Sequence, residues 1–241
     1  MPTIRLTVPL LLPSWLYRGL RRLKHAVRGK RRTGPDLSGD REVEFSFIAG
    51  HLPDGPGRAL DFGCGSTSLS LMAAERGFDV VAFDREPQTF PWRHPRIIFR
   101  HGDLLHTDFP DAQLDLIINC SAVEHVGLTG RYGVTNGDSD GDLHAMARLR
   151  AMLRPTGIML LTIPCGRDAV FSPLHRVYGR ERLPRLLEGF GAEEEAYWIK
   201  DSENCWVQCG KESALDFHPT ADLTHPVLCS CALGCFVLRR Q

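Results

Sequence analysis

The stretch that decides the fold is Asp61–Ser66, which reads Asp-Phe-Gly-Cys-Gly-Ser. An apolar run that begins at Arg58 leads into it. A segment with helical periodicity, Thr67–Arg76, follows it, with Ser66 or Thr67 as the predicted N-cap. A glycine turn between a strand and a helix lets the backbone approach a ligand closely, and it directs free helical N–H groups at that ligand. The sequence therefore predicts a ligand-binding turn here.

Apolar runs alternate with helical patterns along most of the chain. Helices are predicted at Glu42–His51 and at Asp142–Leu153, the second of which Pro155–Gly157 would end. The runs predicted as further strands are Asp79–Phe83, Arg96–Arg100, Leu114–Asn119 and Ile158–Ile163. Strands separated by helices favour a parallel sheet with right-handed crossovers. The late runs Glu193–Lys200 and Cys229–Leu238 have no helix between them, which predicts an antiparallel hairpin at a sheet edge.

Acidic residues stand in register with the ends of the predicted strands. Asp84 ends the second strand, 23 residues after Asp61, where a carboxylate accepts hydrogen bonds from ribose hydroxyls. Asp103 follows the third strand, where it can accept from an adenine amino group, and Asp115 opens the fourth. Each acid alone is commonly a strand cap or a loop carboxylate, but the set indicates a ligand site. The third glycine of the nicotinamide-dinucleotide fingerprint would fall at Ser68, so that fingerprint is incomplete.

Residues 58–165 resemble the class I S-adenosylmethionine-dependent methyltransferases, and most closely their small-molecule branch with the ubiquinone and menaquinone methyltransferases. Asp61, Gly63 and Gly65 match the first motif of the family. Asp84 matches its ribose-binding acid and Asp103 its adenine-side acid. Other matching segments are Phe109–Asp111, Leu114–Ile118 and Arg154–Gly157, while Val123–Leu128 and Gly130–Gly133 are similar to a narrower, poorly characterised group.

The resemblance implies a doubly wound, Rossmann-like α/β fold. Its sheet would be seven-stranded and mixed, mostly parallel, with a C-terminal antiparallel hairpin. The resemblance also implies an enzyme that uses S-adenosylmethionine as its cofactor. The residues expected to bind that cofactor are Asp61, Gly63, Cys64, Gly65, Asp84, Asp103, Leu104, Asn119, Cys120 and Ser121.

His125 is the candidate general base. The methyl group of the donor is already activated, so the protein has to position the reactants and remove a proton from the acceptor. His125 lies just past the fourth predicted strand, beside the expected sulfonium. An imidazole, with an ordinary pKa of about 6.5, can act as a base at neutral pH. The alternative is a structural role, in which His125 caps the next helix or packs against the donor.

Two loops at the carboxyl edge of the sheet are candidates for contacts to the methyl acceptor. One provides Arg131 and Tyr132, and the other provides His175, Arg176 and Tyr178. Such clusters would suit phosphate, carboxylate or sugar hydroxyls, although each residue could instead anchor its loop. We expect O-methylation of a small-molecule or glycan/lipid-linked acceptor. The alternatives are an RNA or protein methyltransferase and a non-catalytic S-adenosylmethionine-binding protein.

The charges of the chain are unevenly distributed. The 241 residues include 29 basic and 29 acidic side chains, so the formal net charge is zero. Residues 1–34 hold nine of the basic residues and no acid. Apolar residues recur on one helical face of this segment, at Leu16, Leu20, Leu23 and Val27. We therefore predict a basic amphipathic arm with its linker over residues 1–40 and a methyltransferase domain over 41–241.

The basic arm has three possible roles: peripheral contact with a membrane through residues 14–32, binding of RNA phosphates, or docking on the acidic domain. Aromatic residues that could stack on bases are sparse in the arm, which makes nucleic acid the weaker alternative. The chain has no apolar run of about 18 residues and no signal-peptide pattern, and its eight cysteines suit reduced thiols. We expect a cytoplasmic protein, at most peripheral at a membrane surface, of undetermined oligomeric state.

No metal site is predicted. Asn136–Gly141 partly matches the start of a calcium loop, but the glutamate needed at position 12 would fall at Ala147. Its acids are interpreted as turn residues, with Asp142 as the N-cap of the next helix. Five cysteines crowd the C-terminal part with His218 and His225 between them, but they lack a C-x2-C pair. They are interpreted as small residues packed against the sheet.

Overall fold

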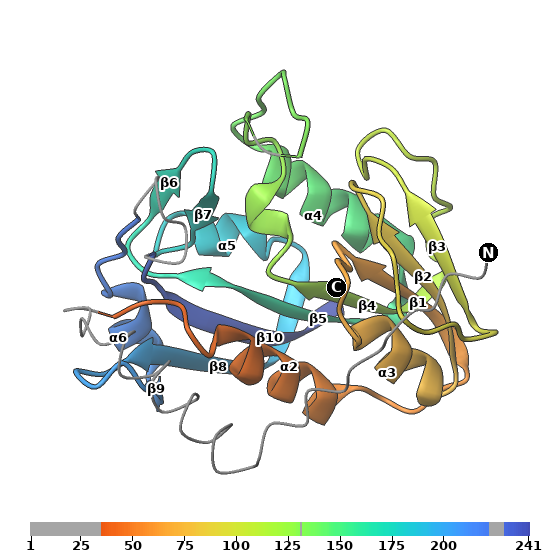
Figure 1. Cartoon of the computed structure of the whole chain (residues 1–241), viewed down its shortest axis with the longest axis horizontal. Coiled ribbons are helices and arrows are strands. Elements are labelled where there is room, and N and C mark those ends of the chain that lie inside the picture. The colour runs from red at the N-terminus through yellow and green to blue at the C-terminus, as the bar shows by residue number, and fades with distance from the viewer. Residues whose placement is uncertain (1–34, 131, 222–228) are drawn as a thin grey trace, which may run out of the picture. The chain divides into compact units, whose positions relative to one another are not determined.

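An eight-stranded mixed sheet forms the centre of the structure, a computed structural model that describes residues 35–130, 132–221 and 229–241 (Figure 1). The strand order is β3-β2-β1-β4-β5-β10-β8-β9, and β6 and β7 form a separate two-stranded hairpin. The strands are β1 (Gly57–Phe62), β2 (Phe78–Asp84), β3 (Ile97–His101), β4 (Leu114–Cys120), β5 (Leu153–Cys165), β6 (Ala169–Phe171), β7 (His175–Val177), β8 (Phe190–Lys200), β9 (Trp206–Cys209) and β10 (Ala232–Arg240).

The first five strands of this order run parallel, which decides where a ligand can bind. β2 and β4 flank β1, and β3 and β5 lie outside them. The carboxyl ends of parallel strands lie at one edge of the sheet, and ligands of doubly wound folds bind there. The turn after β1, Asp84 at the end of β2 and Ser121 after β4 are therefore brought together.

Helices cover both faces of the sheet. α2 (Asp40–His51) and α3 (Leu69–Glu75) pack on one face, and α4 (Gly141–Met152) and α5 (Arg182–Leu186) pack on the other (Figure 1). Side chains of the central strand β4 pack against helices on both faces of the sheet. Leu116 and Ile118 belong to the core under α2 and α3, while Ile117 belongs to the core under α4. A strand buried on both faces is a continuous apolar run, which the sequence shows here. The short helices are η1 (Val123–His125) and α6 (Lys211–Leu215).

The predicted fold class is confirmed, but the predicted strand number and hairpin position are wrong. β9 is an eighth strand, between the two late runs in the sequence. The same segment contains α6, so the expectation that no helix separates these runs is also wrong. The two late strands β8 and β10 do pair antiparallel. However, β10 lies between β5 and β8, and β9 covers the other side of β8. The late pair is therefore interior to the sheet, in keeping with the almost complete burial of β10.

α3 begins later than predicted. Ser68 precedes it, not Ser66 or Thr67. Thr67 belongs to the turn, because its hydroxyl donates to the Cys64 carbonyl at 3.0 Å, while its oxygen accepts from the N–H of Leu69, the first helical residue, at 3.4 Å. The free helical N–H groups are therefore not at the glycines, whose own backbone forms the wall of the site.

α4 also differs from its prediction at both ends. Asp140 occupies the cap position and makes no side-chain capping bond, while the predicted cap, Asp142, is already helical. The helix ends at Met152, before the Pro-Thr-Gly turn that was expected to end it. Leu153 instead pairs with Leu114 of β4, so the chain passes directly from helix to strand.

The residues just before α2 pack on the domain. We call Asp36–Gly39 the strap. The backbone N–H of Asp36 donates to Asn204 Oδ1, and Asn204 Nδ2 donates to Asp36 Oδ1, both at 2.9 Å. Lys200 Nζ and Trp206 Nε1 donate to the Ser38 carbonyl at 2.5 and 3.0 Å. The predicted arm, residues 1–34, lies outside the described residues. None of the helices formed by the residues that are described is long and apolar enough to cross a bilayer.

Candidate functional site

A cavity of about 720 Å³ opens at the carboxyl ends of β1, β2 and β4, and we call it the main cleft. Nine of the ten residues predicted to bind the cofactor line it: Asp61, Gly63, Cys64, Gly65, Asp84, Asp103, Leu104, Cys120 and Ser121. These residues come from four separate strand ends and the turns that follow them. The parallel order of the strands is what gathers them.

The glycine turn forms a narrow wall of the cleft. Gly63 has φ +67° and Gly65 has φ +50°, in the left-handed region that glycine adopts without strain. A Cβ atom on Gly63 would lie 2.3 Å from the Cβ of Ala122. The N–H of Gly63 donates to the Phe83 carbonyl at 2.8 Å, which ties the turn to β2. A side chain at position 63 therefore cannot be accommodated without movement of the backbone.

Asp61 is buried beneath this turn and still lines the cleft. Its Oδ2 accepts a hydrogen bond from the Ser70 hydroxyl at 2.5 Å. Burial raises the pKa of Asp61 to about 6, against the lowering effect of the hydrogen bonds from Ser70. The carboxylate is thus ionised at neutral pH at an energetic cost, which a bound cation would relieve.

Asp84 and Asp103 are held in place on the other side of the cleft. Asp84 accepts from the backbone N–H groups of Gly65 and Glu86, both at 2.8 Å. Asp103 is paired with Arg85 and accepts from the Leu105 N–H at 3.0 Å. Burial alone would raise the pKa of Asp103, but the Leu105 hydrogen bond and the Arg85 charge outweigh it and hold the pKa below its usual value. Asp103 is therefore an ionised hydrogen-bond acceptor.

Asn119 is the one predicted cofactor residue that does not line the cleft. Its side chain is completely buried. Oδ1 accepts from the Val123 N–H at 3.3 Å, and Nδ2 lies 3.9 Å from Met146 Sδ. Alternation along β4 explains the difference, because Asn119 faces the α4 side while Cys120 faces the cleft. Asn119 shapes the turn into η1.

His125 stands at the end of η1 and lines the main cleft. Its Nδ1 lies 2.6 Å from the Leu174 carbonyl oxygen, which can only accept, so Nδ1 carries the proton. In the neutral ring Nε2 is then the basic nitrogen, and it lies 3.7 Å from Glu124 Oε1. The ring of Tyr132 is 5.6 Å away, centroid to centroid. The geometry is that of an oriented imidazole with a carboxylate beside its basic nitrogen.

The predicted acceptor residues do not form one cluster. Tyr132 lines the main cleft, and Arg131 lies outside the described residues. Arg176 is buried, donates to the carbonyls of Val126 at 2.6 Å and Asp138 at 3.0 Å, and lies 3.5 Å from the Asp142 carboxylate. It therefore anchors the loop between η1 and α4.

Of the other two residues predicted in the second acceptor loop, Tyr178 is buried in the fold and His175 lines a cavity. Tyr178 is buried, and its hydroxyl donates to Asp142 Oδ2 at 3.0 Å, so it also holds the fold together. His175 alone of the second predicted loop faces a cavity. The polar groups of Arg176 are used on backbone carbonyls and that of Tyr178 on Asp142, the predicted helix cap, which explains why neither reaches a ligand.

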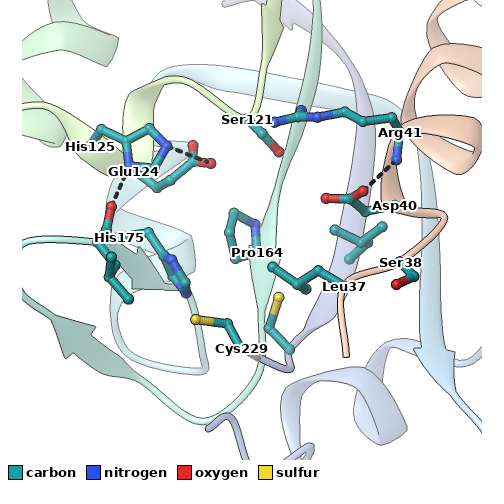
Figure 2. Close-up of a pocket in the computed structure, with 13 residues that line it drawn as sticks. Leu37, Ser38, Asp40, Arg41, Ser121, Glu124, His125, Pro164, His175 and Cys229 are labelled. Atoms are coloured by element: carbon teal, nitrogen blue, oxygen red, sulfur yellow. Dashed lines mark hydrogen bonds and ion pairs between the residues drawn. The ribbon is translucent and has the colours of Figure 1, made fainter. Parts of the chain in front are cut away.

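That cavity is a second one, of about 370 Å³, and Figure 2 shows the residues that line it. Among the described residues, the two share Arg41, Ser121 and His125. The rest of the second cavity is lined by Leu37, Ser38, Asp40, Glu124, Pro164, Leu174, His175, Cys229, Cys231 and Leu233. His125 thus stands between two cavities.

Sequence reasoning missed Arg41 and Glu44 of α2. Glu44 is completely buried and accepts from Arg41 Nη1 at 2.8 Å, from Thr162 Oγ1 at 2.9 Å and from the Ser121 hydroxyl. Burial raises the pKa of Glu44, although Arg41 and the hydroxyls act against it. A glutamate in a helix is ordinarily exposed. Since α2 also precedes residues 58–165, where the sequence resembles the methyltransferases, no motif points to Arg41 and Glu44.

The cysteines do not form a metal centre with the residues described around them. Within residues 35–130, 132–221 and 229–241, no three His, Cys, Asp or Glu side chains are grouped to hold a metal ion. Cys165, Cys231 and Cys235 are buried, and burial raises the pKa of each thiol. They act as small apolar residues in the core.

The fold and the main cleft define the fold class of the protein. A mostly parallel sheet with antiparallel late strands, a left-handed glycine turn after β1 and acids at the next strand ends are the features of the class I S-adenosylmethionine-dependent methyltransferase fold. Residues 59–136 match the family described as a methyltransferase domain. Residues 104–207 match a family described as a Caenorhabditis protein of unknown function.

Curated relatives agree with this class. A probable S-adenosylmethionine-dependent methyltransferase of Mycolicibacterium smegmatis is 28% identical over 146 residues, 56% of this chain and 52% of that protein. A protein of the same description from Mycobacterium tuberculosis is 25% identical over 138 residues, 53% of this chain and 46% of that protein. The chain thus spans about half the length of the curated relatives it matches.

Solved structures share the fold. A Burkholderia thailandensis 1,6-didemethyltoxoflavin-N1-methyltransferase with bound S-adenosylhomocysteine superposes with a TM-score of 0.51 at 17% identity, covering 98% of this chain and 93% of that one. The N-methyltransferase NodS of Bradyrhizobium japonicum, also with S-adenosylhomocysteine, gives 0.53 at 15% identity, covering 91% and 97%. At these identities the similarity establishes the fold.

Proposed function

We propose that this chain is an S-adenosylmethionine-dependent methyltransferase that methylates a hydroxyl oxygen of a small-molecule or glycan/lipid-linked acceptor. One observation carries the proposal: His125 lines both the main cleft and the second cavity. A base in that position can face a donor in one and an acceptor in the other. The names of the mycobacterial relatives support methyl transfer as the reaction class.

The residues of the main cleft fit the donor. At Gly63 the cleft is bordered by backbone alone, because a Cβ atom there would collide with the Cβ of Ala122. Buried Asp61, ionised at a cost, suits the amino group of the methionine part. Asp84 and ionised Asp103 line the same cleft, and we assign Asp84 to the ribose hydroxyls and Asp103 to the adenine amino group.

The chain's own contribution to the reaction is positioning and proton removal. When bound, S-adenosylmethionine supplies a methyl group on a positively charged sulfur. The acceptor oxygen takes this methyl group while its proton moves to His125 Nε2, so one S–C bond breaks, one O–C bond forms and S-adenosylhomocysteine leaves. The Leu174 carbonyl orients the ring, and Glu124, 3.7 Å from Nε2, stabilises the imidazolium.

Calorimetry with S-adenosylhomocysteine tests the donor assignment first. We expect saturable binding of one molecule per chain and no binding of NAD, whose fingerprint is incomplete here. S-adenosylhomocysteine release from S-adenosylmethionine, with a panel of neutral alcohols as acceptors, then tests the reaction. Failure to bind S-adenosylhomocysteine would refute the proposal. Binding with methyl transfer only to RNA or protein would favour the alternative acceptors, and binding without transfer to any of them a non-catalytic role.

We further propose that residues 14–32 contact membranes peripherally. The support is the pattern of that segment, with apolar Leu16, Leu20, Leu23 and Val27 on one helical face and basic residues around them. Flotation with phosphatidylserine-containing vesicles should recover the full chain but not a chain that lacks residues 1–34. Equal recovery of both would contradict the proposal, and loss of RNA binding alone on deletion would favour a nucleic-acid role.

A further inference from the structure

The second cavity has walls that the main cleft does not use. Beyond the shared residues, it is bounded by Leu37 and Ser38 of the strap, Pro164 of β5, His175 of β7 and Leu233 of β10 (Figure 2). Its volume lies in the range of small-molecule sites, at the lower end. His125 lines both this cavity and the main cleft. A group bound in the second cavity would therefore lie beside the same side chain as a donor in the cleft.

The strap is a fixed wall of this cavity. Two reciprocal hydrogen bonds join Asp36 to Asn204, and the buried ammonium of Lys200 donates to the Ser38 carbonyl. Lys200 also donates to the Asn204 carbonyl at 2.8 Å and lies 4.8 Å from the centre of the Trp206 ring. The turn between β8 and β9 therefore holds the strap in place. Strand β9 contributes to this wall through Trp206, which donates to the Ser38 carbonyl.

The charges that face this cavity favour a ligand without negative charge. Asp40 and Glu124 line it, and Figure 2 shows the Asp40 carboxylate directed into it. Among the described lining residues only Arg41 carries a guanidinium, and the buried carboxyl of Glu44 engages it. Even with Glu44 protonated, the carboxylates in the described lining outnumber the guanidinium. An anion placed here would lose its hydration and meet like charges.

Four apolar side chains, Leu37, Pro164, Leu174 and Leu233, also line the cavity. The other described lining residues are Ser38, Ser121, His125, His175, Cys229 and Cys231. The arginine and tyrosine side chains that would have suited an anionic acceptor, Arg176 and Tyr178, are buried on Asp142 instead. What the cavity offers is therefore apolar contact for a ring or short chain, with hydrogen-bond acceptors for hydroxyl groups. This combination corrects the expectation of a phosphate or carboxylate on the acceptor.

We infer that the second cavity is the acceptor site and that it selects a neutral, hydroxyl-bearing group over an anionic one, with Asp40 as a specificity-determining residue. The inference rests on the proposed methyl transfer and deepens it. Asp40 accepts a hydrogen bond from a neutral acceptor and repels a carboxylate or phosphate in the same position. The apolar walls contact the body of the acceptor.

Two matched fragments test the selection: cyclohexylmethanol and cyclohexanecarboxylate, titrated into the full chain saturated with S-adenosylhomocysteine and followed by NMR. We expect the alcohol to bind at least about tenfold more tightly than the carboxylate. The Asp40→Asn variant should reduce this ratio. A carboxylate that binds as tightly as the alcohol, or a ratio unchanged in Asp40→Asn, would overturn the inference. Failure of the S-adenosylhomocysteine complex to form would instead count against the proposed function.

A cavity-filling variant tests the location. Leu37→Trp should abolish binding of cyclohexylmethanol, because the indole fills the second cavity, while the affinity for S-adenosylhomocysteine stays unchanged. Ile98→Trp is the matched control, since Ile98 is 66% exposed on β3, and it should leave both affinities unchanged. If Leu37→Trp binds S-adenosylhomocysteine and the alcohol as the wild type does, the acceptor site is elsewhere.

Discussion

The main cleft and the second cavity are neighbours, yet they are built in different ways. Apart from Arg41, the cleft is lined by residues between 61 and 138, in turns that follow consecutive parallel strands. The second cavity is assembled from five separate stretches between residues 37 and 233. The cleft follows from the topology of the sheet, whereas the cavity depends on the strap, the β6–β7 hairpin and β10. Under the proposed function, donor recognition would follow from the fold class and acceptor recognition from loops particular to this chain.

His125 is where the two regions meet, and its removal should have the largest effect. His125→Ala should lower the rate of S-adenosylhomocysteine release with an alcohol acceptor by about 10²- to 10⁴-fold, because the proton acceptor is lost. The affinity for S-adenosylhomocysteine, measured by calorimetry, should stay within about twofold. His94→Ala, which removes an imidazole on the loop before β3, is the control and should retain the full rate. An undiminished rate in His125→Ala would assign His125 a structural role.

A substitution of Arg176 tests whether this residue stabilises the fold or contacts the acceptor. The Arg176→Met variant removes hydrogen bonds to the Val126 and Asp138 carbonyls and a charge 3.5 Å from Asp142. We expect the free energy of unfolding in urea to fall by about 1–3 kcal/mol, because buried carbonyls lose their donors while Asp142 keeps its ion pair with Arg182. The exposed Arg93→Met control should change it by less than about 0.5 kcal/mol. If the variant keeps its stability but has a raised KM for the acceptor, Arg176 contacts the acceptor and does not anchor the loop.

Asp84 tests the cleft alone. Asp84→Ala should weaken S-adenosylhomocysteine binding about 100-fold, since two hydrogen bonds from ribose to a charged group are lost. Asp79→Ala is a matched control on the same strand, at its amino end and exposed, and it should bind normally. Thermal unfolding of the two variants would separate a loss of ligand contact from a loss of the Gly65 hydrogen bond. An unchanged affinity in Asp84→Ala would remove Asp84 from the ribose-binding role.

The main cleft was largely predictable from the sequence for a physical reason. Gly63 requires a left-handed backbone and Asp84 ends a buried strand, and both are local signals that parallel topology carries to one edge. Asn119 was misassigned because one residue of alternation turns a side chain from the cleft to the opposite face of the sheet. Sequence spacing alone does not fix which face each residue of a strand buried on both sides will take.

The second cavity could not be predicted, because its contacts are distant in sequence. Glu44 meets Thr162 across 118 positions, and Asp36 meets Asn204 across 168. Arg176 carries the same local signal whether it points at a ligand or at a buried carboxylate, and the loop conformation decides between them. β9 is not predicted from the sequence because its four residues are too few to show a periodic pattern. Long-range packing, which no motif records, decides all of these.

Substitution of Asp61 is expected to give the smallest change in ligand affinity. It should also change how stability and affinity depend on pH. In the folded chain its pKa is about 6, above the ordinary value of 3.8. The protonated form is therefore favoured by folding, and the unliganded chain gains stability from this group as the pH falls from about 6 to 4. Asp61→Asn keeps the acceptor for the Ser70 hydroxyl but removes the buried charge. At pH 7.5 it should be more stable than the wild type, by about 3 kcal/mol at most, and this difference should shrink at pH 5.

Binding should respond in the opposite direction. The wild type should lose affinity for S-adenosylhomocysteine below pH 6, as Asp61 becomes protonated and no longer pairs with the ligand's ammonium group. Asp61→Asn should bind about tenfold more weakly at pH 7.5, as expected for the loss of one charge-assisted hydrogen bond, and its affinity should be flat between pH 7.5 and 5. Calorimetry and urea unfolding at both pH values measure the two effects together. A variant that is no more stable than the wild type at pH 7.5, yet binds equally well, would show that the buried charge neither strains the empty cleft nor holds the donor.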